Sequence, residues 1–500
     1  MRMKINLNEH KIIKAVSIYR NGFLLFGLAI FLSLLSTSSY GQNPSDLIYQ
    51  KDSLKADLVD LKKMLYESHE NPFFYVDSTT FELTFDSIYQ SINEDISLAE
   101  FSTKVSQLLQ LLKDSHTTLS LKRFFNFTRA NDALNLYFIT SRIGDDLILR
   151  KDYLDSIPSG SVITSINGIT SEKILKDVEP YYFYEGNSLE QAPLLLAGIA
   201  PKIFALNYGV ELLNNIEFSY NGVPKRIDYP GITYKTIKKD KRSDSPNPYK
   251  IETEAGTAFL KIGSFSAKSD RHYERFLRKS FKKINNQKTD SLVIDLRNNL
   301  GGSVWRMEEL FTYLSGPDVL SPHSISMIKS PLSSKKYEKL TKGLGGWIRV
   351  HLFKKNDKMR VFREVAGTPL HQRDTFIYKV YSAKKKHAFH GTKTLFINHF
   401  SGSASVLFTS QFKSLGFGKT MGTPCLGPYG GTWGDATPYM LNRSGLLVSI
   451  SVLKLHLNSS KGSSSESIQP DEYYSPTIND LQQNIDGLKR YYSFFFFYLP

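Results

Sequence analysis

Three short stretches carry residue types that could perform acyl transfer. In "SGSASV" (401–406), Ser403 stands between an apolar strand-like run and a helix-like run, at what would be the carboxyl edge of a sheet. A lone serine in this position is more commonly a helix N-cap than a nucleophile. It becomes a nucleophile only if a base takes its proton and donors hold the oxyanion.

The two other stretches offer these partners. His116, in "KDSHTTLS", ends a helical run and could act as a general base if the fold brings it to a serine. In "VIDLRNNLGG" (293–302), Gly301 and Gly302 follow a strand and precede a helix, where backbone N–H groups can hold an oxyanion. An ordinary tight turn explains these glycines equally well. Neither the GxxxxGK[ST] phosphate loop nor the G-x-S-x-G elbow is present.

The elements that must position these residues follow from hydrophobic spacing. Residues 57–69 and 98–116 have apolar side chains at helical intervals, which predicts an N-terminal helical cap domain over 43–125. Residues 130–234 read instead as short strands separated by Gly, Asn and Pro turns. Within them, "SIPSGSVITSINGITSEKIL" (156–175) predicts a strand, an Asn-Gly turn and a short helix, which looks like the second half of a PDZ domain.

Strands and helices alternate after a polar linker at 238–250. Strands are predicted at 257–265, 291–297, 394–400 and 445–455, and helices at 271–284 and 304–316 and after Ser403. This alternation predicts an α/β peptidase core over 250–480, followed by a C-terminal helical tail at 481–500. The basic segment 317–393 interrupts the pattern and receives no assignment.

The three stretches, in this order, resemble the family of tail-specific or C-terminal processing serine peptidases. The family's usual text is Asp-Gly-His-Thr, then Asp-Leu-Arg-x-Asn-x-Gly-Gly, then Ser-x-Ser-Ala-Ala/Ser-Glu. The resemblance runs from about residue 55 to 480 and includes "SIQPDEYYSPTINDL" (467–481). It implies a ClpP/crotonase-like β-α core with a helical cap and an inserted PDZ-like domain, and a peptide or protein substrate.

Departures from the family text decide between its two branches. The lysine base of the processing branch would stand 25 residues after Ser403, but this position is Pro428, and the nearest lysines are Lys419 and Lys454. A Ser–Lys dyad is therefore not supported. Val406 also replaces the family's glutamate three residues after the nucleophile.

The tricorn-core-like branch, with serine, histidine and glutamate, fits better. The resemblance then implies Ser403 as nucleophile, His116 as base, Ser115 beside it, and Glu466 as the carboxylate that orients the imidazole. Asp435 in "TWGDATP" competes with Glu466 for that role. The oxyanion would be held by the amides of three residues, namely Gly301, Gly302 and Ala404.

The composition and the N-terminal residues limit the possible localisation, cofactors and partners of the protein. A basic leader and the 15-residue apolar run at 22–36 predict a signal peptide over 1–41, cleaved near Gly41, and hence a periplasmic or extracellular protein; an uncleaved anchor is the alternative. The single cysteine, Cys425, excludes an intrachain disulfide and a cysteine zinc cage, and no cofactor or metal is predicted. The net charge of +15 falls to about +11 without the leader's +4, and its scattered clusters argue against nucleic acid.

The sequence thus predicts an exported serine endopeptidase. A catalytically inactive peptide-binding scaffold of the same family is the first alternative, because the lysine and the family glutamate are missing. Hydrolysis of a non-peptide ester or amide is the second. Membrane proximity of the aromatic tail stays open, as do the substrate-binding residues and the oligomeric state.

Overall fold

A computed structural model of the protein describes residues 47–121, 130, 132–189, 197–239, 247–314, 323–334, 368–378, 386–457 and 465–498. The predicted signal peptide and much of the segment 317–393 lie outside the described residues. From Asn43 to Pro500 the chain forms one compact unit.

The central sheet of the C-terminal half has six strands in the order β12-β13-β14-β17-β18-β23. β12 and β13 are antiparallel, and every later pair is parallel. The strand bounds are β12 Tyr249–Glu254, β13 Thr257–Ile262, β14 Ser291–Asp295, β17 Thr392–Ile397, β18 Lys419–Gly422 and β23 Glu472–Tyr473. Parallel strands buried on both faces have nearly continuous apolar sequences, and for this reason the run "SLVIDL" predicts a strand.

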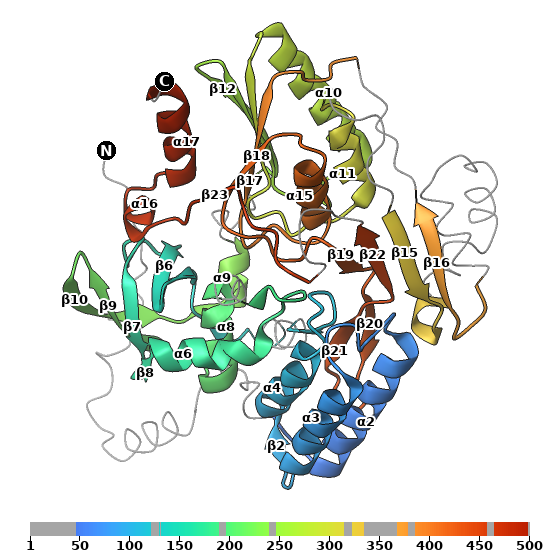
Figure 1. The fold of residues 1–500 in the computed structure, drawn as a ribbon. Helices are drawn as coiled ribbons and strands as arrows, with labels where there is room; N and C mark the ends of the chain where they lie inside the picture. The colour runs from blue at the N-terminus through green and yellow to red at the C-terminus, as the bar shows by residue number, and fades with distance from the viewer. Residues whose placement is uncertain are drawn as a thin grey trace, which may run out of the picture. The chain divides into compact units, whose positions relative to one another are not determined.

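Three helices that connect successive parallel strands cover one face of this sheet (Figure 1). They are α10 (Asp270–Asn286), α11 (Val304–Phe311) and α15 (Ala404–Ser414). Right-handed crossovers that all run in one direction place their helices on the same face. The other face carries a smaller cluster in which Phe259, Val293 and Phe396 pack with Leu488 and Tyr492.

The predicted helices and strands of the core are confirmed, with one exception. The run 445–455 is not one strand: it forms β21 (Leu447–Ile450) and β22 (Leu453–Leu457), which belong to different sheets. β21 pairs with β20 (Thr437–Met440) and β3 (Thr118–Ser120), whereas β22 pairs with β15 (His323–Ile328) and β19 (Gly431–Gly434); β16 (Arg373–Tyr378) extends the latter sheet. The apolar pattern is the same in both halves, so it does not reveal the change of sheet at residues 451–452.

The N-terminal part is helical, as predicted. Its helices are α2 (Lys51–Ser68), α3 (Ser78–Ser91) and α4 (Leu98–Gln110), with β1 (Ile48–Tyr49) paired to β2 (Ile96–Ser97). Asp77 and Ser97 directly precede α3 and α4, and their side chains accept backbone hydrogen bonds as N-caps. The carboxylate of Asp57 accepts hydrogen bonds from the backbone of Arg443 and Ser444, and so joins α2 to the β20–β21 hairpin.

Residues 134–239 contain an antiparallel sheet and its connecting helices, which we together call the antiparallel unit. Its strands are β5 (Phe138–Ile143), β6 (Asp146–Asp152), β7 (Val162–Ile166), β8 (Ile169–Thr170), β9 (Leu213–Tyr220) and β10 (Val223–Pro230), beside the pair β4 (Leu134–Asn135) and β11 (Ile232–Thr233). Its helices are α6 (Ser171–Val178), η4 (Glu179–Tyr181), η6 (Ala197–Ile199), α8 (Ala200–Tyr208) and α9 (Tyr234–Lys239). The predicted Asn167-Gly168 turn has positive φ at both residues, as a two-residue hairpin turn requires.

The helical part and the antiparallel unit share one buried apolar cluster, which also includes β21 side chains. The chain ends with α16 (Ile478–Gln482) and α17 (Gly487–Tyr498). Within the ranges described, no helix is both long and apolar enough to span a bilayer.

Candidate active site

Ser403 occupies a strained turn between β17 and α15. Its backbone has φ 51° and ψ −119°, a conformation that L-residues rarely adopt and that concentrates at functional sites. Although Ser403 immediately precedes the helix, its side chain makes no capping hydrogen bond. The hydroxyl is therefore available for another partner, which argues against the N-cap interpretation.

That partner is His116, from the loop between α4 and β3. The Ser403 Oγ lies 3.1 Å from His116 Nε2, within hydrogen-bond reach although 287 residues separate the two in sequence. Burial lowers the pKa of His116, the charge of Asp114 raises it, and the charge of Lys454 lowers it further, with a net decrease. A neutral imidazole is the form that can accept the Ser403 proton.

The opposite nitrogen of the imidazole contacts Ser115. His116 Nδ1 lies 3.1 Å from Ser115 Oγ, and the Ser115 hydroxyl donates to Glu185 Oε2 at 3.1 Å. The hydrogen bonds then run in one direction: Ser403 to His116, His116 to Ser115, and Ser115 to Glu185. This direction fixes the imidazole as the tautomer with a proton on Nδ1 and an acceptor at Nε2.

Glu185, which follows η4, is fully buried and surrounded by donors. Its Oε1 accepts from the Trp433 backbone N–H at 2.8 Å, and its Oε2 accepts from the Thr432 hydroxyl at 2.8 Å as well as from Ser115. Burial raises the pKa of Glu185, and the charge of Lys454 opposes this increase. Since all three hydrogen-bond partners are donors, the contacts favour the ionised carboxylate.

Lys454 on β22 supplies the opposing charge. Its Nζ lies 4.0 Å from Glu185 Oε1 and 4.2 Å from the centre of the Trp433 ring, with Phe74 and Tyr75 on its other sides. The side chain is 2% exposed. Burial lowers the pKa of Lys454, whereas the charge of Glu185 raises it. A buried cation in an aromatic enclosure remains charged most readily beside a buried carboxylate, so the two groups support one another.

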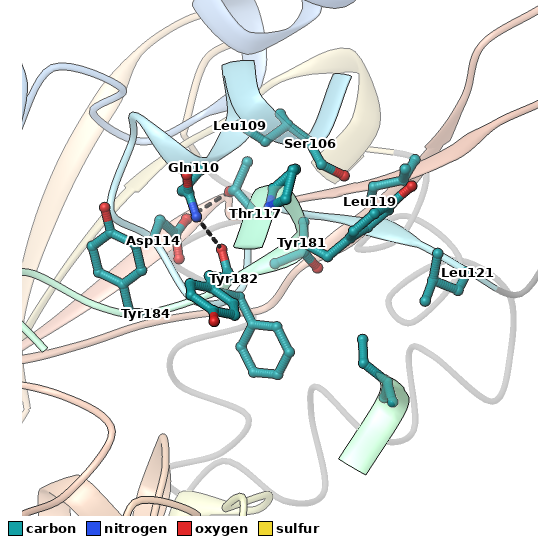
Figure 2. Close-up of a pocket in the computed structure, with 14 residues that line it drawn as sticks. Ser106, Leu109, Gln110, Asp114, Thr117, Leu119, Leu121, Tyr181, Tyr182 and Tyr184 are labelled. Atoms are coloured by element: carbon teal, nitrogen blue, oxygen red, sulfur yellow. Dashed lines mark hydrogen bonds between the residues drawn. The ribbon is translucent and has the colours of Figure 1, made fainter. Parts of the chain in front are cut away.

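Asp114 fixes the loop that carries His116. Its carboxylate accepts from the His116 backbone N–H at 2.8 Å, from the Thr117 hydroxyl at 2.6 Å and from His69 Nε2 at 3.0 Å. His69 Nδ1 accepts from the Asn71 backbone N–H, so its proton is on Nε2. Figure 2 shows the Thr117 contact beside a pocket whose lining includes Asp114 and Tyr184, the residue before Glu185.

The pKa of Asp114 gives a prediction on acid stability. Burial raises this pKa, but the hydrogen bond and charge of His69 lower it to about 2. The folded pKa is below that of an unfolded Asp, so the ionised group adds stability above about pH 4 that is lost as the pH falls toward 2. We expect Asp114→Asn to remove about 2 kcal/mol of this pH-dependent stability, measured by urea unfolding from pH 6 to 2. The exposed Asp86→Asn is the control, and an unchanged pH slope in Asp114→Asn would contradict the prediction.

The three predicted oxyanion amides differ in their surroundings. Gly301 packs against the nucleophile turn so closely that a Cβ would lie 2.6 Å from Ser403 Cβ and 2.8 Å from Ala404 N, and its φ is +102°. However, its N–H already donates to Asn299 Oδ1 at 2.9 Å. Gly301 therefore shapes the turn and is not a free donor, contrary to the sequence prediction. Within the described residues, no hydrogen-bond acceptor is recorded for the N–H of Gly302 or Ala404, which remain the candidate donors.

The predicted orienting carboxylate, Glu466, is not beside the imidazole. Its side chain is exposed, and its backbone carbonyl accepts a hydrogen bond from the Tyr429 N–H. The charge of Glu466 contributes to the raised pKa of Tyr429. Glu185 occupies the place that the sequence prediction gave to Glu466. The competing residue, Asp435, lies in the loop after β19 with φ 52°, and its carbonyl accepts from the Thr437 hydroxyl.

The remaining departures from the family text have structural explanations. Val406 is fully buried on α15 and packs against Gly427, so it serves the core. Lys419 is exposed and pairs with Glu472. Lys454 lies beside Glu185, whereas the side chain that contacts the Ser403 hydroxyl is His116. The sequence analysis did not identify Glu185 as the orienting carboxylate. Glu185 lies in the segment predicted to be PDZ-like, where no motif of the family contains a carboxylate.

A serine in a strained strand-to-helix turn, contacted by a histidine at the carboxyl edge of an α/β sheet, is the arrangement of a serine-type hydrolase. Residues 256–474 match the model of peptidase family S41, a family of serine-type peptidases. No curated protein sequence matches the chain.

Two solved structures of CPAF show the same fold at low sequence identity. A mutant of CPAF superimposes with a TM-score of 0.61 and 15% identity, covering 88% of this chain and 96% of that chain. Mature CPAF complexed with lactacystin gives 0.58 and 14%, covering 89% and 98%. A photosystem II D1 C-terminal processing protease is also matched, with a lower TM-score of 0.42 and 12% identity over 86% of this chain and 96% of that chain.

Proposed function

We propose that this protein is an exported serine endopeptidase in which Ser403 is the nucleophile, His116 the general base, and Glu185, acting through Ser115, the orienting carboxylate. The observation that carries the proposal is the continuous hydrogen-bonded series from Ser403 to Glu185. The match of residues 256–474 to the peptidase family S41 model supports a peptide or protein substrate. The signal-like leader supports export.

The proposed reaction follows from the positions of the protons. Ser403 Oγ attacks the scissile carbonyl while His116 Nε2 takes its proton, and the amides of Gly302 and Ala404 hold the oxyanion. His116 then donates this proton to the leaving amine. Water attacks the acyl-enzyme with His116 again as the base, which releases the second product and restores Ser403.

Glu185 stabilises the imidazolium that forms at each step. Because Ser115 stands between the two groups, the carboxylate acts by polarising the Ser115 hydroxyl and by holding the Nδ1–H tautomer. The arrangement is a Ser–His site with a relayed carboxylate, which supports the tricorn-core-like branch over the Ser–Lys branch. We also propose that the antiparallel unit acts as a PDZ-like domain. In this role it would present extended peptides to the active site.

A labelling experiment tests the proposal. The mature chain is incubated with a fluorophosphonate probe, digested and analysed by mass spectrometry, and in parallel with unfolded polypeptides at neutral pH. We expect the adduct on Ser403 and cleavage within the polypeptides. A folded protein that neither labels nor cleaves would instead indicate the peptide-binding scaffold, and cleavage of simple esters alone would indicate a non-peptide substrate.

The pH profile should depend on Lys454. Its charge lowers the pKa of both Glu185 and His116. Activity needs Glu185 ionised and His116 neutral, so it is lost as the pH falls through either value. We expect Lys454→Met to raise the pKa values of both Glu185 and His116. The acidic limb of the kcat/KM profile should then move to higher pH. Lys454→Arg, which keeps the charge, and the exposed Lys419→Met should leave the limb in place; an unmoved limb in a folded Lys454→Met variant would contradict this role.

A further inference from the structure

A small cavity lies between the loop that carries His116 and the segment that leads to Glu185 (Figure 2). Its volume is about 100 Å³. One wall comes from α4 and the residues that follow it, and the facing wall comes from residues 180–184. The four residues of the proposed hydrogen-bonded series are not part of the lining, so the cavity takes no direct part in the chemistry described above.

Gln110, near the end of α4, joins the two walls. Its side-chain Nε2 donates to the backbone carbonyls of Glu179 at 2.9 Å and of Tyr182 at 3.4 Å (Figure 2). Because Glu185 follows directly after this wall in the chain, these contacts help to set its position relative to the loop that carries His116. A ligand between the walls would add to them.

Ser106 on α4 brings a buried hydroxyl to the cavity. Its side chain belongs to the lining, and the residue is only 6% exposed. One turn earlier, the Ser102 hydroxyl donates to the Leu98 carbonyl at 2.7 Å, which is a common partner for a serine within a helix. Within the described part of the chain, the Ser106 hydroxyl has no such partner. A buried hydroxyl without a hydrogen bond is unfavourable, so a ligand that bonds to it removes that cost.

The rest of the lining selects an uncharged ligand. It is mainly apolar or aromatic, with Leu109 and Leu119 on one side and the tyrosines of 180–184 on the other. Burial raises the pKa of Tyr181 to about 12, so its hydroxyl is neutral at ordinary pH. The carboxylate of Asp114 already accepts from three donors, and the described residues of the lining include no cation. An anion would therefore meet a like charge and no opposite one.

The volume limits the ligand to about one ring. An apolar cavity of about 150 Å³ takes a benzene molecule, and the cavity between α4 and residues 180–184 is somewhat smaller. We propose that it is a regulatory site for a small neutral molecule with one ring and one hydrogen-bonding group, which bonds to Ser106.

A ligand bound there would hold the segment that leads to Glu185 against the loop that carries His116. It would favour the arrangement in which the hydrogen bonds run from Ser403 to Glu185, because a ligand shifts a protein toward the state that binds it better. The effect on turnover rests on the proposed peptidase function, whereas the binding itself does not.

Phenol is the probe, and toluene and benzoate are its comparisons. Toluene keeps the ring without the hydroxyl, and benzoate adds a negative charge. Binding to the mature protein is measured by saturation-transfer NMR, with Ser106→Ala, which removes only the hydroxyl, and with Ser106→Met, which fills the cavity. We expect phenol to bind with a Kd of about 1 mM, about fivefold more tightly than toluene or benzoate, and the preference over toluene to disappear in Ser106→Ala.

The matched control is Ser102→Ala on the same helix. The Ser102 hydroxyl bonds to Leu98 and does not line the cavity, so phenol binding should not change. Saturating phenol should raise the kcat of the Ser403-intact protein about twofold or more, and should not change that of Ser106→Met. Circular dichroism checks the fold of Ser106→Met, and the nearly isosteric Ser106→Ala tests the hydroxyl if the larger side chain is not accommodated.

The outcomes separate the site from the activity. No phenol binding, equal binding of phenol and toluene, or equal phenol binding by the unchanged protein and a folded Ser106→Met variant would overturn the site. Ser106-dependent binding that leaves the kcat of an active protein unchanged would overturn the regulatory role. Ser106-dependent binding to a protein that cleaves no peptide would overturn the peptidase function and leave the binding site standing.

Discussion

Replacing Ser403 with Ala is expected to lower kcat by about ten-thousandfold or more, because the nucleophile is lost while the rest of the site remains. The strained turn should survive, since the side chain makes no capping bond that holds the helix start. The measurement is hydrolysis of a quenched fluorescent peptide at enzyme concentrations high enough to detect residual turnover, with labelling by the fluorophosphonate probe in parallel.

The matched control is Ser405→Ala, two residues further along the same turn. The Ser405 side chain is buried, and no hydrogen-bond partner is recorded for its hydroxyl. Its removal should therefore leave both labelling and turnover nearly intact. Equal losses in Ser403→Ala and Ser405→Ala would point to disruption of the turn and would contradict the nucleophile assignment.

Replacing Glu185 with Gln is the second change with a large expected effect. The amide has one acceptor oxygen where the carboxylate has two, and its NH₂ group would face a donor from Ser115, Thr432 or Trp433. The tautomer and orientation of His116 would then be lost. We expect kcat to fall by about a hundredfold to ten-thousandfold with a smaller change in KM, measured by steady-state hydrolysis of the same peptide.

Glu466→Gln provides the contrast, since the family resemblance assigns the orienting role to that residue. Its side chain is exposed, and its replacement should change kcat by no more than about twofold. If Glu466→Gln abolished activity and Glu185→Gln did not, the relay through Ser115 would be wrong. Circular dichroism and thermal unfolding of both variants separate a catalytic loss from a folding defect, which matters because Glu185 is buried beside Lys454.

The sequence determined the chemistry-bearing residues that lie in recognisable local motifs. Ser403 lies between β17 and α15, and His116 lies in the loop that follows α4; hydrophobic periodicity predicted these strands and helices, although it extended the helix before His116 beyond its end at Gln110. It also predicted the Asn167-Gly168 turn, because a two-residue hairpin requires residues that tolerate positive φ. These features depend on contacts between near neighbours in the chain, which a single sequence records directly.

The tertiary structure decided what depends on distant contacts. The carboxylate assignment moved from Glu466 to Glu185 because a side chain's direction depends on packing, and spacing along the chain does not encode it. The role of Lys454 emerged only when β22 was placed against β19, since a lysine in a strand normally faces solvent. Gly301 is not a free oxyanion donor, because its N–H donates a hydrogen bond to Asn299 Oδ1. The sequence gives no sign of this hydrogen bond. Sequence motifs thus indicated the proposed nucleophile and base, and the fold indicated the residues proposed to adjust their pKa values.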